Sequence, residues 1–255
     1  MYKNIKIHQE NKIVEIILNR PERMNAITVD LLNELKKAVI DINNNDDIHV
    51  IILSGAGRAF SAGVDLRELE SNGTDVSSGG VGEILDEHAN EVIKLLSESP
   101  KAVITKINGF CFTGGLELAL SADLIYVANE AKIGDTHAVL GFRPSWGLTQ
   151  RLPKLIGNMK AKELSFTAKT ISGIDAKDLG IAIDSFPLDE LNENVYNIAL
   201  KIADNSPNSI KAYKDLYAAA QNNGLKKGLE YESNTSYDIP EVEERMRNFL
   251  TKLKS

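Results

Sequence analysis

The chain has 255 residues, of which 43% are hydrophobic and 25% charged, a balance typical of a globular protein with a sizeable core. Its 29 Lys and Arg residues against 36 Asp and Glu residues give a formal net charge of −7, so the basic surface that nucleic-acid binding requires is not indicated. The single cysteine, Cys111, excludes an internal disulfide framework. The start MYKNIKIHQENK has neither a signal nor a transit pattern, and no apolar run reaches the length of a membrane span. We therefore expect a cytoplasmic protein with no nucleic-acid or membrane partner.

Short apolar runs alternate with amphipathic segments along the chain, a pattern typical of an α/β fold. The strands that we expect cover residues 13–18, 50–53, 102–107, 124–127 and 180–183. Thr28 can cap a helix whose apolar face contains Leu31, Leu32, Leu35, Val39 and Ile42. A second amphipathic helix is indicated by the spacing of Ile84, Leu85, His88, Val92, Leu95 and Leu96. Both helices are predicted to pack against a sheet.

Two further segments define the organisation of the chain. Residues 70–82 (ESNGTDVSSGGVG) are rich in Gly and Ser and have no periodicity, so we interpret them as a surface loop. Strand signals fade after about residue 189, and helical patterns replace them. We therefore predict a core over residues 1–189 and a helical C-terminal subdomain over residues 190–255.

Two glycine-containing turns follow predicted strands, SAGVD at residues 61–65 and TGGLE at residues 113–117. Small residues at such turns allow the backbone to approach a ligand, and a helix that begins there presents unpaired N–H groups. Two N–H groups that converge on one carbonyl oxygen form an oxyanion hole. Alternatively, both turns are ordinary connections, and Asp65 only caps the helix that follows it.

The segments LNRPERMNAIT, FSAGVDL, NGFCFTGGLELALSADL and LGFRPSWGLTQRLP, in this order between about residues 18 and 153, resemble the enoyl-CoA hydratase/isomerase (crotonase) superfamily. The resemblance implies an α/β fold, a crotonase-like spiral of ββα units with a helical C-terminal region that makes trimer contacts, commonly in a hexamer of two trimers. It also implies an acyl-CoA thioester substrate, with coenzyme A as part of that substrate and no separate cofactor. The implied oxyanion donors are the amides of Ala62 and Gly114. The implied contacts with the rest of the substrate lie at Ala62, Gly63, Val64 and Asp65.

Glu117 is a carboxylate within a run of small apolar residues. It lies three residues beyond Gly114, almost one helical turn, so its side chain can reach the cavity that the Gly114 amide faces. In hydratases of the family that this chain resembles, the matching glutamate positions and activates water. Burial would raise the pKa of this carboxyl and suit it to proton transfer. The alternative is a glutamate at the surface or in a local pair.

The sequence departs from the family pattern at the second glutamate that hydratases usually carry. His137 occupies that position, and an imidazole can donate a proton or hold a water against Glu117. Alternatively, His137 is a loop residue without a role in chemistry, and Asp135 is the substitute carboxylate. If this segment is extended, Asp135 and His137 share a face and both reach the pocket. Trp146, the only tryptophan, either walls the acyl pocket or packs in the core.

The function that we predict is hydration of a trans-2-enoyl-CoA, with Glu117 and His137 as the proton-transfer pair. The same oxyanion hole also supports double-bond isomerisation, decarboxylation or thioester hydrolysis, and a protein that binds acyl-CoA without turnover is a third possibility. Thr113 stands where family members often have a third glycine, but the donor position Gly114 is retained. No cluster of Cys, His and carboxylates has the spacing of metal ligands, so we predict no metal site.

Overall fold

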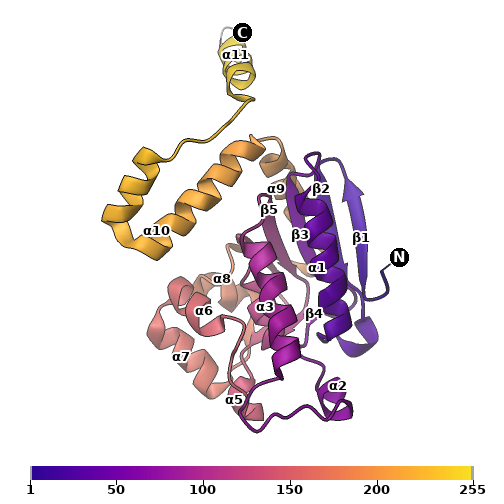
Figure 1. Ribbon diagram of the computed structural model, residues 1–255. Coiled ribbons are helices and arrows are strands. Elements are labelled where there is room, and N and C mark those ends of the chain that lie inside the picture. Colours follow the sequence, from indigo (N-terminus) through magenta and orange to yellow (C-terminus); the bar gives the residue numbers. More distant parts are fainter. Residues whose placement is uncertain (1, 254–255) are drawn as a thin grey trace.

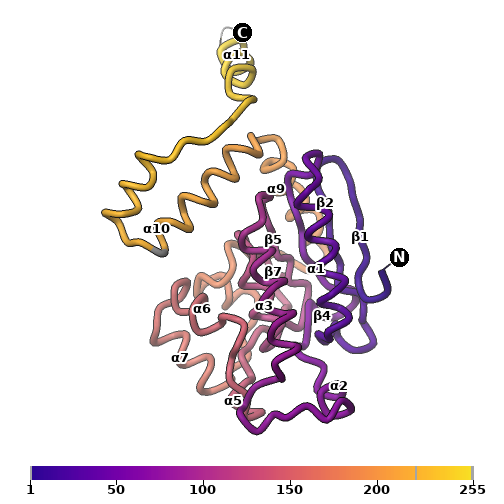
Figure 2. The backbone as a smooth tube through the Cα atoms, in the orientation of Figure 1, coloured from indigo at the N-terminus to yellow at the C-terminus, as the bar shows by residue number. Residues whose placement is uncertain are grey.

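The computed structural model describes residues 2–253, and its larger sheet has six strands in the order β1-β2-β3-β5-β7-β10 (Figures 1 and 2). The strands are β1 (Ile5–Glu10), β2 (Ile13–Leu18), β3 (Val50–Gly55), β5 (Ala102–Ile107), β7 (Leu124–Ala128) and β10 (Asp184–Phe186). β1 is antiparallel to β2, and all other neighbours are parallel. The central strands β3 and β5 are buried almost throughout, as expected for parallel strands covered on both faces.

Helices cover the two faces of this sheet. α1 (Val29–Asn43) and α3 (Glu83–Ser97) lie side by side in front of the sheet in Figure 1, and α9 (Leu188–Ala203) lies behind it. The predicted cap is confirmed, because the side chain of Thr28 accepts a hydrogen bond from the Leu31 amide at 3.2 Å. The apolar face predicted for α1 is buried in full.

The smaller sheet has four short strands in the order β4-β6-β8-β9, of which the first three are parallel. They are β4 (Ala59–Ser61), β6 (Phe110–Phe112), β8 (Lys132–Gly134) and β9 (Ile171–Ser172). The chain alternates between the sheets: β3, β5 and β7 are each followed by a strand of the smaller sheet and then by a helix. This is the repeated ββα unit that the resemblance implies.

The helices that follow strands of the smaller sheet are short. α2 (Leu66–Ser71) follows β4, α4 (Gly114–Ala119) follows β6, and α5 (His137–Leu140) follows β8. The remaining helices of the core are η1 (Pro21–Arg23), α6 (Leu148–Ile156), α7 (Asn158–Thr167) and α8 (Gly173–Leu179).

Two details of the predicted elements are wrong. Residues 180–183 do not form a strand, because Gly180 ends α8 in a left-handed conformation (φ 89°) and β10 begins only at Asp184. On α3, Ile84 is exposed rather than part of the buried face, which is completed by Ala89 and Ile93.

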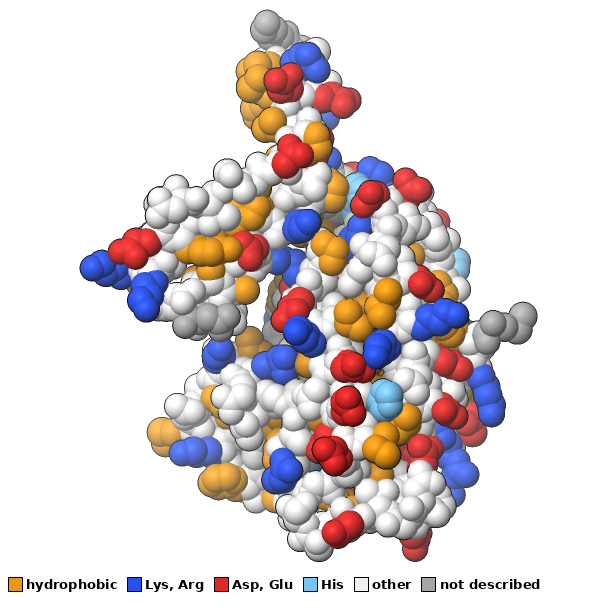
Figure 3. Space-filling model, viewed as in Figure 1, with side chains coloured by type: hydrophobic (Ala, Val, Ile, Leu, Met, Phe, Trp, Pro, Cys, Tyr) orange, Lys and Arg blue, Asp and Glu red, His pale blue; other side chains and the backbone are white. Residues whose placement is uncertain are grey.

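The C-terminal helices α10 (Pro207–Asn234) and α11 (Val242–Lys252) extend away from both sheets (Figure 1). Their apolar side chains are largely exposed and form hydrophobic patches on these helices in Figure 3. The exposed large apolar residues of these helices, with Leu253 directly after α11, are Tyr213, Tyr217, Leu225, Leu229, Tyr231, Val242, Met246, Phe249, Leu250 and Leu253. The helical character expected after residue 189 is thus observed, whereas the division into subdomains at that residue stays a prediction. Within residues 2–253, no helix combines the length and apolar character needed to cross a membrane.

Candidate functional site

The candidate site lies where the three parallel strands of the smaller sheet end. β4 ends at Ser61, β6 at Phe112 and β8 at Gly134, and in the ladder Ser61 pairs with Cys111 and Phe112 with Gly134. Because parallel neighbours end at the same edge of a sheet, the residues after each strand come together there. This edge therefore brings together the 61–65 turn, the 113–117 turn and the segment with Asp135 and His137.

The two glycine turns pack directly against each other. Gly63 has a φ of +92°, and a Cβ atom built on it would lie 2.1 Å from Thr113 Oγ1 and 3.4 Å from the Gly114 nitrogen. Gly115 is equally constrained, since its Cβ would lie 2.5 Å from the carbonyl oxygen of Ser61. Glycine is therefore required at both positions for the turns to approach this closely.

The amides of the two predicted oxyanion donors differ in their present hydrogen bonds. Gly114 is the first residue of α4, where an amide has no acceptor inside the helix, and no acceptor for it is found within residues 2–253. The Ala62 amide donates to the Met24 carbonyl oxygen at 2.9 Å. The expectation of two free amides therefore holds for Gly114, whereas the Ala62 amide serves a ligand only if its bond to Met24 is shared or opened.

The segment around Met24 is held firmly in this position. Met24 and Asn25 both have positive φ values, 49° and 53°. Asn25 is fully buried, and its side-chain amide donates to the carbonyl oxygens of Ala56 and Ala59, at 2.9 Å and 2.7 Å. The Ser61 hydroxyl donates to the Asn25 carbonyl at 2.8 Å. The RMNAIT motif thus forms one wall behind the Ala62 turn.

Glu117 is buried, with 2% of its surface exposed. Its Oε1 accepts hydrogen bonds from the backbone amides of Trp146 and Leu148, at 2.9 Å and 3.1 Å. Burial raises the pKa of this carboxyl, although the two amides and His137 act in the opposite direction. Because Oε1 is held by these amides, Oε2 is the oxygen left for proton transfer.

His137 lies between Glu117 and Asp135. Its Nε2 is 3.6 Å from Glu117 Oε2, and its Nδ1 is 2.6 Å from Asp135 Oδ1. The His137 backbone amide also donates to Asp135 Oδ1, at 3.1 Å. Burial alone would raise the pKa of Asp135, but hydrogen bonds from His137 and Ser165 outweigh it, so the pKa is lowered. A carboxylate at Nδ1 orients the imidazole and leaves Nε2 directed at Glu117.

The segment of Asp135 and His137 lacks the extended shape under which both side chains were expected to reach the pocket, and His137 lines the cavity whereas Asp135 does not. The segment is not extended, because His137 begins α5 and Thr136 has φ −104° and ψ 14°. The Asp135 carboxylate instead folds onto the amide and the ring of His137 across this turn.

The residues predicted to bind substrate in the 61–65 turn do not all line the cavity. Ala62 and Val64 line the cavity beside Glu117 together with Gly114. Asp65 does not: its carboxylate pairs with Arg20 at 2.9 Å, and both side chains are largely buried. Asp65 stands at the N-cap position of α2 but makes no side-chain capping bond, so its structural role is to join this turn to the motif at residues 18–28.

The structure adds residues that the sequence did not single out. Asp86, on α3, accepts hydrogen bonds from the Trp146 indole nitrogen at 2.7 Å and from the Ser145 hydroxyl at 2.6 Å. Trp146 is both buried and part of the cavity lining, and its role as a wall for an acyl group stays a prediction. Nothing in the sequence links Asp86 to a residue 60 positions later, since an acidic residue in the first turn of a helix is common.

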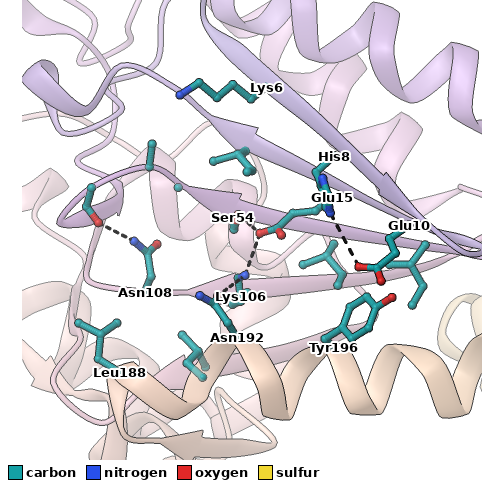
Figure 4. A pocket seen from close by; sticks show the side chains of 17 residues that line it. Lys6, His8, Glu10, Glu15, Ser54, Lys106, Asn108, Leu188, Asn192 and Tyr196 are labelled. Carbon is teal, nitrogen blue, oxygen red and sulfur yellow. Dashed lines mark hydrogen bonds and ion pairs between the residues drawn. The ribbon is translucent and has the colours of Figure 1, made fainter.

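The cavity that these groups share is small, about 60 Å³. A larger cavity of about 650 Å³ lies between the larger sheet and α9 (Figure 4). None of the residues that line it lines the Glu117 cavity. Its buried ammonium, Lys106, is 2.8 Å from Glu15 Oε1 and donates to Asn192 at 2.5 Å. We therefore place the candidate active site at the smaller cavity, where a buried carboxylate, an imidazole and an unpaired amide meet.

Comparison with known proteins shows the family of this chain. A family profile described as enoyl-CoA hydratase/isomerase matches residues 8–255. The Δ(3,5)-Δ(2,4)-dienoyl-CoA isomerase of Arabidopsis thaliana peroxisomes is 34% identical, over 90% of this chain and 87% of that protein. A short-chain-enoyl-CoA hydratase of Clostridium acetobutylicum is 31% identical, over 98% of this chain and 96% of that protein.

The fold is similar to solved structures as well. The crystal structure of enoyl-CoA hydratase from Bacillus anthracis superposes with a TM-score of 0.85 at 34% identity, covering 91% of this chain and 88% of that one. The match to the profile spans nearly the whole chain, and the repeated ββα units occur where the resemblance places them. The chain belongs to the enoyl-CoA hydratase/isomerase family and is an enzyme of that family.

Proposed function

We propose that this enzyme adds water to the double bond of a trans-2-enoyl-CoA, with Glu117 and His137 as the proton-transfer pair. The observation that carries the proposal is the buried chain of contacts from Asp135 through His137 to Glu117, placed beside the unpaired amide of Gly114. Addition of water to an α,β-unsaturated thioester requires an acid or base at the double bond and a donor at the thioester oxygen. The cavity offers both.

The oxyanion donors act on the thioester oxygen. As water adds to C3, the electrons of the double bond move toward the thioester, and negative charge builds on its oxygen. The Gly114 amide stabilises that charge, and the Ala62 amide joins it when the substrate oxygen takes the place of the Met24 carbonyl. Loss of one such donor typically costs about 3 kcal/mol in the transition state.

The acid/base pair acts on the other side of the substrate. The free oxygen Oε2 of Glu117 and Nε2 of His137 are 3.6 Å apart, so one water in the cavity can hydrogen bond to both atoms. Glu117 takes a proton from this water as the hydroxyl adds to C3, and the same proton then passes from Glu117 to C2 of the enolate, directly or relayed through Nε2 of His137. Burial, which raises the pKa of Glu117, favours its ability to hold and return that proton.

Isomerisation is the second candidate function. It needs a proton removed from one carbon of the substrate and returned to another, which a single carboxylate can do. Glu117 is the one carboxylate that lines the cavity within residues 2–253, and an Arabidopsis relative is named as a dienoyl-CoA isomerase. A 3-enoyl-CoA supplied as substrate separates the two functions, because an isomerase converts it to the 2-enoyl-CoA.

The direct test uses purified protein and crotonyl-CoA. We expect loss of the enoyl absorbance and formation of 3-hydroxybutyryl-CoA, both strongly reduced in the Glu117→Gln variant. The matched control is Glu130→Gln, at an exposed glutamate remote from the cavity lining. Absence of turnover on enoyl-CoA substrates of every length, with coenzyme A binding retained, would instead support an acyl-CoA-binding protein.

The assembly and the setting of the enzyme are part of the same proposal. We expect a homotrimer or a hexamer of two trimers, and the exposed apolar residues of α10 and α11 support contact with another copy. Coenzyme A enters as part of the substrate, and the proposed steps use side chains and amides of this chain alone. The cytoplasmic location stays a prediction. Light scattering of the purified protein measures its assembly state.

A further inference from the structure

The cavity beside Glu117 is too small for a long acyl chain. Its volume of about 60 Å³ equals that of roughly two water molecules and lies far below the roughly 300–1,000 Å³ of pockets for larger ligands. Leu66 and Leu140 are 42% and 49% exposed and lie at its open side. Val81 and Trp146 are 5% and 2% exposed, so they form its closed side.

Trp146 is fixed at both ends of its side chain. The indole nitrogen donates to Asp86 Oδ1 at 2.7 Å, and the same oxygen accepts from the hydroxyl of Ser145 at 2.6 Å. On the backbone, the Trp146 amide donates to Glu117, and its carbonyl accepts from Arg151 at 3.0 Å. The ring therefore cannot swing out of the cavity unless several of these bonds break.

The ring also lies directly against the proposed oxyanion donor. A Cβ atom built on Gly114 would lie 2.5 Å from Cζ3 of Trp146 and 3.2 Å from Cε3 and Cη2. A thioester oxygen bound to the Gly114 amide would place the next carbon atoms of its acyl chain beside this ring. The first carbons beyond the reacting double bond would then meet the indole.

We propose that Trp146, held by Asp86, is the wall that limits this enzyme to short acyl chains. The proposal rests on the proposed function, because it assumes that an acyl-CoA thioester binds at Gly114. Trp146 sets the chain length through its volume, and Asp86 is a positioning residue that keeps the ring in place. The substrate class is then a thioester with a short acyl group, in agreement with the small cavity.

The first test measures kcat/KM with trans-2-enoyl-CoA substrates of four to ten carbons. We expect the native enzyme to prefer the four-carbon substrate over the ten-carbon one by at least tenfold, and Trp146→Ala to reduce this ratio by at least tenfold. Trp146→Phe retains much of the ring volume but loses the hydrogen bond to Asp86, so its ratio should fall by less than in Trp146→Ala. Val139→Ala, at an exposed residue of α5 that does not line the cavity, is the matched control and should leave the ratio within about twofold. An unchanged ratio in folded Trp146→Ala would overturn the proposal.

The second test needs no turnover. Trp146 is the only tryptophan, so its fluorescence reports directly on whatever touches the ring. Butyryl-CoA should change this fluorescence, and calorimetry should show that decanoyl-CoA gains affinity relative to butyryl-CoA in Trp146→Ala. If the native protein hydrates no substrate but shows the fluorescence change and the affinity change, the proposed function is wrong and the role of Trp146 in limiting chain length is supported. If hydration occurs but butyryl-CoA leaves the fluorescence unchanged, the proposed function is supported and the proposed role of Trp146 is wrong.

Asp86→Ala distinguishes a role in positioning the Trp146 ring from a general loss of activity. Loss of its carboxylate frees the indole but removes no atom from the cavity lining, so the chain-length ratio should fall by less than in Trp146→Ala. Asp86→Asn retains an acceptor oxygen and should restore most of the native ratio. A uniform loss of kcat/KM at every chain length in Asp86→Ala would contradict the positioning role.

Discussion

The cavity beside Glu117 and the larger cavity beside Lys106 each contain a buried charged group, and these groups have different partners. The Lys106 ammonium has a carboxylate and an amide oxygen as partners, and Glu15 also accepts a hydrogen bond from Ser54 (Figure 4). Glu117 has one oxygen held by two amides and the other at 3.6 Å from an imidazole, beyond hydrogen-bond distance. A buried charge with complete partners stabilises a fold, whereas one with a free oxygen is prepared to react with a ligand.

The largest effect that distinguishes the two cavities is expected from Glu117→Gln. Glutamine keeps the oxygen that accepts from Trp146 and Leu148 but cannot take up a proton, so kcat should fall by about 10²- to 10⁴-fold. Lys106→Met is the matched variant in the larger cavity, and its folded form should retain kcat within about twofold. Steady-state kinetics on crotonyl-CoA measures both. Similar losses in the two variants would show that the larger cavity also belongs to the site.

The next effect concerns His137. His137→Gln removes the imidazole, and because Glu117 remains, we expect kcat to fall by about 10²-fold with KM changed less. Asp135→Asn keeps the imidazole but replaces the carboxylate at 2.6 Å from Nδ1, so it should give a smaller loss and a shifted pH profile of kcat. Unchanged turnover in His137→Gln would return this residue to the alternative of a loop histidine.

In the larger cavity the expected effect is on stability. Lys106→Met leaves the partly buried Glu15 without its ion-pair partner, so the free energy of unfolding should fall by about 1–3 kcal/mol. The double variant with Glu15→Gln removes both charges and should recover part of that loss. Urea unfolding monitored by circular dichroism measures these differences. Full stability in Lys106→Met would mean that the pair contributes nothing to the fold.

In the larger sheet, β1 and the three-residue β10 were missed because IKIHQE and DSF contain no apolar run, whereas β2, β3, β5 and β7 are rich in apolar residues and could be predicted. The strands of the smaller sheet could not, since β4, β6 and β8 have three residues each and show no periodicity. These short strands nevertheless determine the site, because they bring the three segments with functional residues to one edge. The order of the strands in the smaller sheet depends on tertiary packing, which a local sequence pattern does not indicate.

The motifs predicted which residues meet at the candidate site. They did not predict the contacts between segments that lie far apart in the sequence. Glu117, Gly114 and His137 lie together around one cavity, as expected. The pairing of Asp65 with Arg20 and of Trp146 with Asp86 joins segments 45 and 60 residues apart. The bond between Ala62 and Met24 depends on two positive φ values that a sequence of non-glycine residues does not reveal.

A smaller effect is expected from the pH dependence of Glu117→Gln. The pKa of Glu117 is raised in the folded state, so the folded protein binds this proton more readily than the unfolded chain. Its contribution to stability is present below the unfolded pKa of 4.5 and is lost as the pH rises through the folded pKa. Glu117→Gln lacks this loss, so its stability relative to the native enzyme should increase as the pH rises from 5 to 8. Because both side chains keep the amide hydrogen bonds, the change should be smaller than that in Lys106→Met.

The smallest effect concerns Thr113, whose φ of 46° and ψ of −115° are unusual for a residue with a Cβ atom. Thr113→Ala keeps that atom, whereas Thr113→Gly removes it, so the glycine variant should be more stable than the alanine variant by about 1 kcal/mol. The comparison between the two variants cancels most of the loss of the hydroxyl and the methyl group. Thermal unfolding measures it, and kcat should stay within about twofold in Thr113→Gly because Gly114 keeps its place. If the alanine variant were the more stable one, the backbone at residue 113 would carry no strain. The close approach of the turns at residues 61–65 and 113–117 would then alone determine which residues this position accepts.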